Sequence, residues 1–164
     1  MMHQAAKQTM TDASNILLSS HGTCGAQAAE RMALELCHEN TQLVHLLVVP
    51  EFWKHMMGDD WLNNGITRDR YARYLEAELG RELDEHIDRV REQAEARGID
   101  YSSEIVIGEP DQCLRRYCDQ GRFDLVVVGS PRPRGKPGLR SRMTSDKLLK
   151  SMDIPVMVAP YPDE

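Results

Sequence analysis

Short, unbroken apolar runs separated by helical patterns constrain the fold of this chain more than any other feature. The clearest runs are Leu46–Val49 and Leu125–Val128, and neither alternates with polar residues. Continuous apolarity over a few residues is typical of strands that are covered on both faces, as in a parallel sheet. Both runs are far shorter than the roughly 20 residues needed to cross a bilayer. We therefore expect no membrane-spanning segment.

Strand and helix patterns alternate along the whole chain. Expected strands cover 15–19, 42–49, 101–107, 124–128 and 155–159; expected helices cover 24–40, 68–97, 111–120 and about 142–151. The long second helix is predicted from apolar residues three and four positions apart between Tyr71 and Ala94. This order predicts an α/β fold with an open parallel sheet, right-handed crossovers and helices on both faces. With 164 residues, one domain over 15–160 is expected, with a flexible N-terminus at 1–14 and a tail at 161–164.

Charge is distributed unevenly. The net charge is −6, yet residues 129–150 hold seven basic residues and one acid, which leaves thirteen basic residues against twenty-five acids elsewhere. An acidic protein with one basic block can attract a single anion without binding nucleic acid generally. The block has no aromatic residue on which a base could stack. We therefore do not expect a nucleic acid partner.

Cysteine spacing gives no sign of a disulfide framework or a metal site. Cys24, Cys37, Cys113 and Cys118 form no CxxC pair, and His38 directly follows Cys37, so the two side chains point in different directions on a helix. We interpret the cysteines as reduced thiols and expect no metal ligands. Residues 1–15 lack the apolar stretch of a signal peptide, which predicts a cytoplasmic location.

A ligand crevice is expected beyond the carboxyl ends of the strands. In an open parallel sheet of the expected order 3-2-1-4-5, the strand order reverses between the first and fourth strands, and ligands bind at such a point. The segments that converge there are 19–23, 49–53 and 129–143. The first and last also precede helices, whose free N–H groups favour anions.

Three segments of the sequence resemble the universal stress protein family. They are Ile16–Thr23, Gly108-Glu109-Pro110 and the run from Asp124 to Ser130 that reads D-L-V-V-V-G-S, followed by Ile154–Val158. The resemblance extends over about residues 14–160. It implies a Rossmann-like sheet of order 3-2-1-4-5, similar to that of the adenine nucleotide alpha hydrolases. It also implies a homodimer built around the last strand, at Pro155, Val156, Met157 and Val158.

The same resemblance identifies where this chain departs from the ATP-binding members of the family. Those members carry G-x2-G-x9-G-[ST] after the fourth strand and an Asp at the end of the first. Here Gly129 matches the first glycine, whereas Arg132, Arg142 and Met143 replace the later residues and His21 replaces the Asp. Glycines allow backbone N–H groups to approach phosphates, and long side chains obstruct that approach. Arginines can instead hold phosphate by charge.

The candidate crevice residues follow from these segments. They are Ser20, His21, Gly22, Val49, Gly129, Ser130, Arg132, Arg142 and Met143. We expect no catalytic residue among them, because neither His21 nor Ser130 has a partner at catalytic spacing. The segment 52–61, which contains Trp53 and Trp61, has two interpretations: a lid over the crevice or a packed loop.

Two functional hypotheses follow. The first is a non-enzymatic, dimeric stress-response protein of the cytoplasm, a regulatory or binding module that holds no standard cofactor and has an anionic small molecule or a protein as its partner. The second is a protein that binds ATP or AMP, or slowly hydrolyses ATP, through an arginine-rich phosphate loop. Both hypotheses share one fold and differ in the nucleotide that the crevice accepts.

Overall fold

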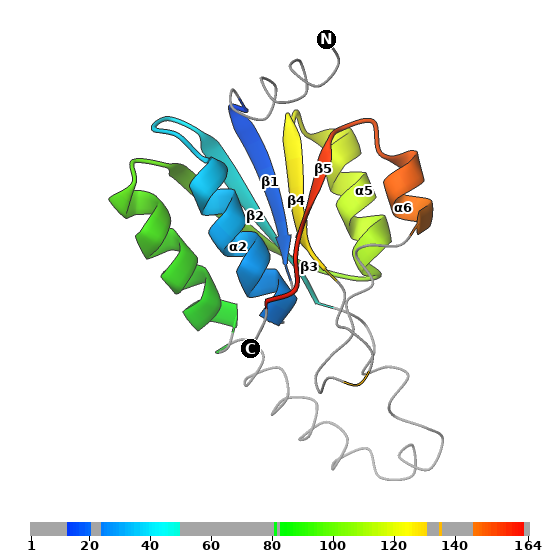
Figure 1. Ribbon diagram of the computed structural model, residues 1–164, viewed down its shortest axis with the longest axis horizontal. Coiled ribbons are helices and arrows are strands. Elements are labelled where there is room, and N and C mark those ends of the chain that lie inside the picture. The colour runs from blue at the N-terminus through cyan, green and yellow to red at the C-terminus, as the bar shows by residue number, and fades with distance from the viewer. Residues whose placement is uncertain are drawn as a thin grey trace.

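The computed structural model describes residues 13–20, 24–49, 81, 83–130, 135 and 146–162. Within these ranges the strands are β1 (Asn15–Ser20), β2 (Gln42–Val49), β3 (Asp100–Ile107), β4 (Leu125–Gly129) and β5 (Val156–Ala159). Every pairing is parallel, and the order across the sheet is β3-β2-β1-β4-β5 (Figure 1). The predicted open parallel sheet of order 3-2-1-4-5 is therefore confirmed. Ile16 of β1 is in register with Leu43 of β2 and Leu125 of β4.

Helices cover both faces of the sheet, as predicted (Figure 1). α2 (Cys24–Leu36) and a helix over residues 83–96, which we call the 83–96 helix, lie on one face. α5 (Pro110–Gln120) and α6 (Asp146–Ser151) lie on the other. Alternate residues of β1 enter two separate cores, because successive strand side chains point to opposite faces: Ile16 and Leu18 pack under α2, and Leu17 packs under α5.

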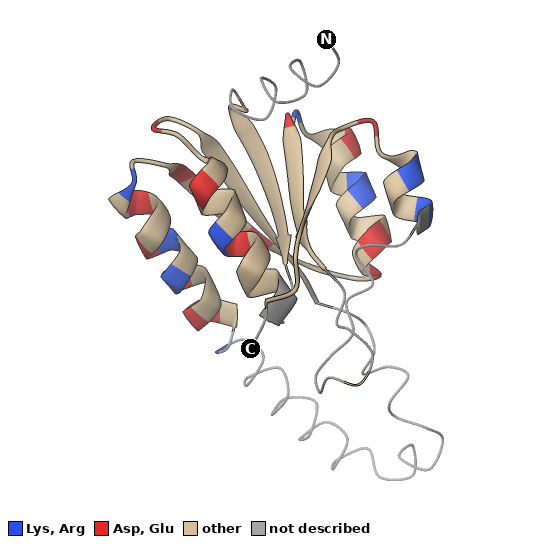
Figure 2. Cartoon of the chain, viewed as in Figure 1, with Lys and Arg blue, Asp and Glu red and all other residues tan. Residues whose placement is uncertain are grey.

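Charged residues lie mainly on the helices and near the ends of strands, whereas the central strands carry none (Figure 2). β1, β2 and β4 are apolar or uncharged throughout, which suits strands that are covered on both faces. In the described ranges, no helix has both the length and the apolar character that crossing a bilayer requires.

α2 ends at Leu36, four residues before the expected end at Asn40. The hydroxyl of Thr41 accepts a hydrogen bond from the N–H of His38 at 2.8 Å, and the N–H of Thr41 donates to the carbonyl of His38 at 3.0 Å. Asn40 adopts a φ of 71°, in the left-handed region that asparagine tolerates. These local bonds satisfy the backbone in a turn and so compete with another turn of helix.

The 83–96 helix ends where Arg97-Gly98 predicted a stop. Gly98 has a φ of 70°, and the N–H of Ile99 donates back to the carbonyl of Ala94 at 3.0 Å. A left-handed glycine is the usual way in which a helix ends and its last carbonyls are satisfied. The expected start of this helix, at residue 68, lies outside the described residues.

Two residues of the predicted motifs determine how the chain enters α5 and β4. Gly108 has a φ of 155°, and a Cβ there would lie 2.8 Å from the Sγ of Cys113, so a side chain would be strained. Asp124, expected to begin the fourth strand, instead precedes it: its Oδ2 accepts hydrogen bonds from the N–H groups of Ser14 and Asn15 at 2.9 and 3.0 Å. The Asp124 carboxylate thus connects the start of β1 to the start of β4 through hydrogen bonds.

Candidate functional site

The carboxyl ends of β1 and β4 lie side by side at the point where the strand order reverses. β1 pairs with β2 on one side and β4 on the other, so chain connections leave these two strands in opposite directions. In open α/β sheets this is where a crevice forms for a ligand. The sheet therefore has its switch point at the place that the sequence predicted for the crevice.

Four of the predicted crevice residues lie at this edge. Ser20 is the last residue of β1 and is fully buried, and Val49 is the last residue of β2. Gly129 ends β4 and is buried, and the N–H of Ser130 donates to the carbonyl of Ala159 at 3.0 Å. The other predicted residues, His21, Gly22, Arg132, Arg142 and Met143, lie outside the described residues, as does the segment 52–61.

Beneath the end of β1, a buried hydrogen-bonded chain runs across three strands. The Oγ of Ser20 lies 2.6 Å from the Nε2 of His45, and the Nδ1 of His45 lies 2.7 Å from the hydroxyl of Tyr101. His45 is in the middle of β2 and has no exposed surface. Both ring nitrogens therefore have a hydroxyl partner, as a buried imidazole requires.

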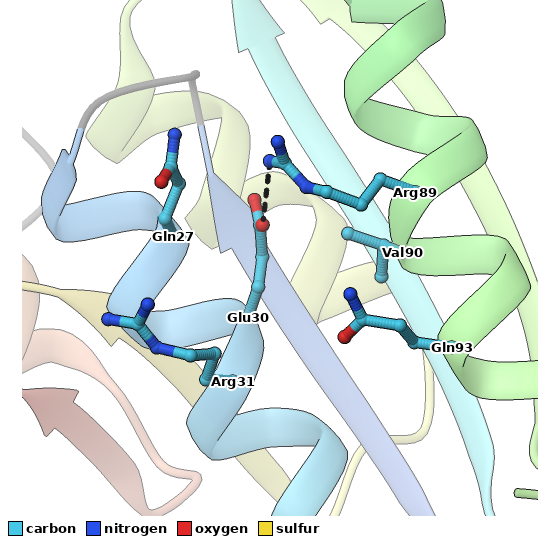
Figure 3. A pocket seen from close by; sticks show the side chains of 6 residues that line it. All are labelled: Gln27, Glu30, Arg31, Arg89, Val90 and Gln93. Carbon is cyan, nitrogen blue, oxygen red and sulfur yellow. Dashed lines mark ion pairs between the residues drawn. The ribbon is translucent and has the colours of Figure 1, made fainter.

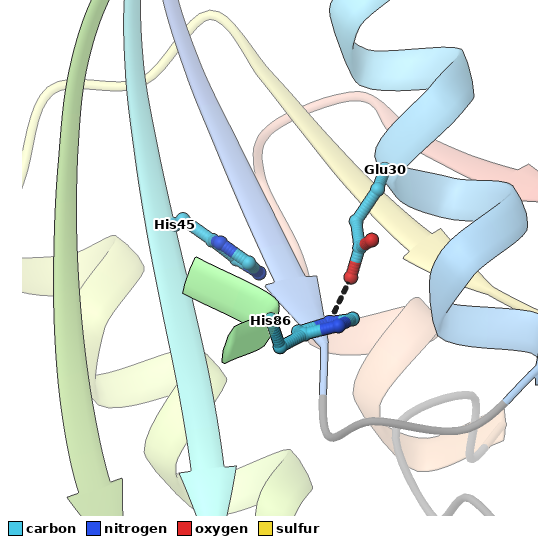
Figure 4. A group of neighbouring side chains, drawn as sticks. All are labelled: Glu30, His45 and His86. Carbon is cyan, nitrogen blue, oxygen red and sulfur yellow. Dashed lines mark ion pairs between the residues drawn. The ribbon is translucent and has the colours of Figure 1, made fainter. Parts of the chain in front are cut away.

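Next to this chain, the Oε1 of Glu30 on α2 and the Nε2 of His86 on the 83–96 helix make a buried contact, which is an ion pair when the ring is protonated (Figure 4). Arg89, one turn from His86, donates from Nη2 to the Nδ1 of His86 at 2.6 Å. The same Nη2 lies 3.6 Å from the Oε2 of Glu30. Because arginine can only donate, Nδ1 of His86 is the acceptor, and the ring proton is on Nε2, facing Glu30.

The two groups of residues form one polar cluster between the sheet and its helices. The rings of His45 and His86 have centroids 5.8 Å apart. One ligand-type atom from each of Glu30, His45 and His86 lies within 4.8 Å of the others, and all three residues are buried. We call Glu30, His45 and His86 the buried triad. Each member comes from a different element: α2, β2 and the 83–96 helix.

A groove between α2 and the 83–96 helix leads from the surface to Glu30 (Figure 3). Its volume is about 210 Å³. It is lined by Gln27, Glu30, Arg31, Arg89, Val90 and Gln93. The Arg89 side chain is 49% exposed, whereas that of Glu30 is 5% exposed, so the guanidinium lies between solvent and the buried carboxylate. The groove therefore gives solvent a route to Glu30, one member of the triad.

Burial controls the protonation of His45, a member of the triad, and of Tyr101 beside it. Desolvation, and after it the repulsion that a protonated His86 would exert, lowers the pKa of His45 from its ordinary 6.5 to about 3. Burial also raises the pKa of Tyr101 far above its ordinary value. His45 is therefore a neutral imidazole at physiological pH, with a lone pair on one nitrogen and a proton on the other.

The cysteines behave as structural thiols where the structure describes them. Burial raises the pKa of Cys37 and of Cys118 to about 11, so both are protonated at neutral pH. The thiolate is the form that attacks electrophiles and binds metals. This supports the interpretation of these cysteines as unreactive.

The sequence contained a signal for the triad that spacing rules for metal motifs do not detect. His86 lies three residues after Leu83 and four before Val90, in phase with the apolar stripe of its helix. His45 lies between Leu43 and Leu47 on the same face of β2, because residues two apart in a strand point to the same side. Polar residues at core positions indicate a buried polar partner, but only the fold shows that they meet.

A family model decides the relationship of this chain. The universal stress protein family matches residues 14–160, nearly the whole chain. The chain belongs to the universal stress protein family. The resemblance seen in the D-L-V-V-V-G-S and G-E-P segments is thus confirmed. Among curated proteins, none matches this sequence significantly.

Solved structures agree with this universal stress protein fold. Hypothetical protein MJ0577 is 16% identical with a TM-score of 0.70, and the match covers 92% of this chain and 98% of that one. The universal stress protein UspA from Lactobacillus plantarum is 22% identical with a TM-score of 0.65, over 89% and 97% of the two chains. A universal stress protein family protein from Arabidopsis thaliana, solved with AMP bound, is 15% identical with a TM-score of 0.57, over 91% and 92%.

At sequence identities this low, the similarity shows that this universal stress protein shares the fold of these structures. The shared architecture places the carboxyl ends of β1 and β4 at the switch point, where doubly wound sheets bind ligands. Which ligand this member accepts depends on its own residues at that edge.

Proposed function

We propose that this universal stress protein is a non-enzymatic, dimeric regulatory or binding module of the cytoplasm whose crevice does not hold ATP in the standard way. The observation that carries the proposal is the replacement of phosphate-loop residues after β4. Arg132 and Arg142 stand where glycines are expected, and Met143 stands where a hydroxyl is expected. Bulky side chains at such positions keep the backbone N–H groups away from phosphate oxygens.

Two described polar groups at the edge of the sheet already have partners, which supports the same proposal. The hydroxyl of Ser20 is hydrogen-bonded to His45, and the N–H of Ser130 donates to Ala159. A ligand that used either group would have to break a hydrogen bond within the protein, at a cost of about 1 kcal/mol or more. Neither group is free to replace the donors that the loop has lost.

A second candidate function is a nucleotide site based on arginine. The Arabidopsis thaliana relative was solved with AMP bound, and arginine side chains can hold phosphate by bidentate hydrogen bonds. Arg132 and Arg142 would then bind the phosphate of AMP or ATP through their side chains instead of the backbone. The two candidates predict opposite responses to charge reversal at these arginines.

Thermal unfolding with millimolar ATP and magnesium, or with AMP, is expected to show no stabilisation of the native chain. A ligand at 100 times its Kd would contribute about 2.7 kcal/mol, or a Tm increase of about 5–10 °C for a domain of this size. Restoring the family pattern with Arg132→Gly, Arg142→Gly, Met143→Ser and His21→Asp is expected to create an ATP-dependent increase. The readout is differential scanning fluorimetry.

The contradicting outcome is an increase in Tm for the native chain. If Arg132→Glu with Arg142→Glu abolishes that increase, the arginine-based site replaces our proposal. The matched control is Arg115→Glu with Arg116→Glu, which reverses the same charge on exposed positions of α5. An increase that survives both pairs of substitutions would place the nucleotide away from the loop.

We propose the last strand as the dimer interface. β5 is an edge strand of the sheet, paired on one side with β4. Val158 is 37% exposed, and Val156 and Met157 are only partly buried. An apolar edge strand with unpaired backbone groups is suited to pairing with a second copy. Together with Pro155, these residues would form the interface.

Val158→Lys is expected to convert the dimer, about 37 kDa, to the 18.7 kDa monomer, because a lysine on an edge strand opposes pairing. The matched control is Ile105→Lys on β3, which is the opposite edge strand and has a comparably exposed apolar residue. Sedimentation velocity at tens of micromolar distinguishes the two species. A native chain that sediments as a monomer, or a dimer broken by Ile105→Lys instead, would contradict the assignment.

A further inference from the structure

The buried triad has a donor set that the universal stress protein fold does not require. Glu30, His45 and His86 are 4%, 0% and 7% exposed, and they face one another between the sheet and two helices (Figure 4). Two imidazoles and one carboxylate form a donor set that is typical of zinc sites with three protein ligands and an open position. Such a set is rare as core packing, since charged groups are costly to bury.

Two atoms of the triad have no hydrogen-bond partner elsewhere in the described chain. The Oε1 of Glu30 and the Nε2 of His86 are fully buried, and among the described residues their polar contact is with each other. The third member, His45, lies beside them, with its ring centroid 5.8 Å from that of His86. The carboxylate of Glu30 also has a permanent cation, Arg89, beside it.

We propose that Glu30, His45 and His86 form a binding site for one zinc ion, entered through the groove between α2 and the 83–96 helix. Zinc bonds to nitrogen and oxygen are about 2.0–2.2 Å long, which places tetrahedral ligand atoms about 3.3 Å apart. The triad atoms lie within 4.8 Å of one another. Zinc binding therefore needs a movement of about 1.5 Å at the widest pair and a separation of the Glu30–His86 contact.

Arg89 competes with the metal for the triad. When zinc takes the Nε2 of His86, the ring proton must move to Nδ1, where Arg89 now donates at 2.6 Å. Two donors cannot face each other, so the guanidinium must leave. It has room to do so, since its side chain is 49% exposed and borders the groove (Figure 3). Zinc also displaces one hydroxyl, of Ser20 or Tyr101, from His45.

Zinc would link elements that otherwise meet only through side-chain packing and hydrogen bonds. The three ligands come from α2, β2 and the 83–96 helix. Because Ser20, the last residue of β1, is hydrogen-bonded to His45, the metal would be held directly beneath the edge where the crevice is expected. The site does not depend on nucleotide binding, so the two proposals are tested separately.

The first test is a titration of the full-length, chelator-treated protein with zinc chloride, followed by isothermal calorimetry and by competition with a chromophoric chelator. The expected result is saturable binding of one zinc ion per chain. Glu30→Gln and His86→Gln should each weaken the affinity at least about 100-fold, because each removes one of three protein ligands. His38→Ala, on an exposed turn after α2, is the matched control and should leave the affinity unchanged.

Arg89→Met gives the sharper test, since this half-exposed residue lies outside the ligand set. Removing the competing cation should tighten zinc binding about 10-fold, because the hydrogen bond from Arg89 to His86 no longer has to be broken. Circular dichroism and urea unfolding confirm that each variant is folded. Cobalt, used as a spectroscopic substitute, should give the visible absorption of a low-coordinate site, and Arg89→Met should preserve it.

Three results would overturn the proposal. These are the absence of saturable zinc binding by the folded native chain, an affinity unchanged in folded Glu30→Gln or His86→Gln, and weaker binding in Arg89→Met. Weaker binding in Arg89→Met would show that Arg89 stabilises a cluster held together by hydrogen bonds between protein groups alone. Loss of binding in His38→Ala would move the ion to the surface.

Discussion

Acidification is expected to destabilise the metal-free protein by about 1.4 kcal/mol for each pH unit below 6.5, through His45 alone. Burial lowers the pKa of His45 to about 3 in the folded state, against 6.5 for an ordinary histidine. Between these values the unfolded chain binds a proton at His45 that the folded chain does not. The His45 contribution is therefore complete above pH 6.5 and is lost progressively as the pH falls towards 3.

Urea unfolding at pH 7, 6 and 5 in the presence of EDTA measures this dependence. The comparison is with His45→Gln, which keeps an uncharged polar side chain but cannot take up a proton. Protonation of Asp and Glu affects both proteins, so the difference between their slopes isolates His45. Parallel pH profiles for the two folded proteins would show that His45 titrates normally and is not buried as described.

Leu114→Ala is expected to lower the free energy of unfolding by about 2–5 kcal/mol. Leu114 is fully buried on α5 and belongs to the core beneath α5 and α6, where it joins Leu17, Leu46 and Val126. Truncation removes apolar contacts and leaves a cavity that rigid neighbouring strands cannot fill. Urea unfolding at pH 7 measures the loss, and the slope with denaturant should stay constant.

Leu149→Ala on α6 is the matched control, because it removes the same atoms from a side chain that is 38% exposed. The expected loss is below about 1 kcal/mol, since much of this side chain is in water in both states. Equal losses in the two variants would contradict the packing of α5 against the sheet.

Much of this fold was predictable because each strand is encoded by its own composition. The run Gln42–Val49 has the same limits in the sequence prediction and in the structure, since it is apolar except at Gln42 and His45 and is bounded by turn residues. The predicted limits of a helix and a strand were wrong where a side chain forms a hydrogen bond to the backbone. Thr41 ends the turn after α2, and Asp124 binds two backbone N–H groups at the start of β1 instead of beginning β4.

The site was less predictable, because its polar groups meet only through tertiary packing. Sequence patterns identified the strand ends, with Ser20 and Gly129 at the switch point. They did not identify Glu30, His45 and His86, which are far apart in sequence and match no metal motif. Each nevertheless occupies a core-facing position in an otherwise apolar pattern. A search for polar residues in phase with the core would have selected all three.

Our account depends most on the proposal that arginines have replaced the backbone cradle for a triphosphate. Its most direct test is the nucleotide content of the native protein, purified without added ligand, denatured in acid and analysed by liquid chromatography with mass spectrometry. We predict adenine nucleotide far below one molecule per chain. One molecule of ATP or AMP per chain would contradict the account, and so would a crystal structure of the same preparation with that nucleotide beside Gly129.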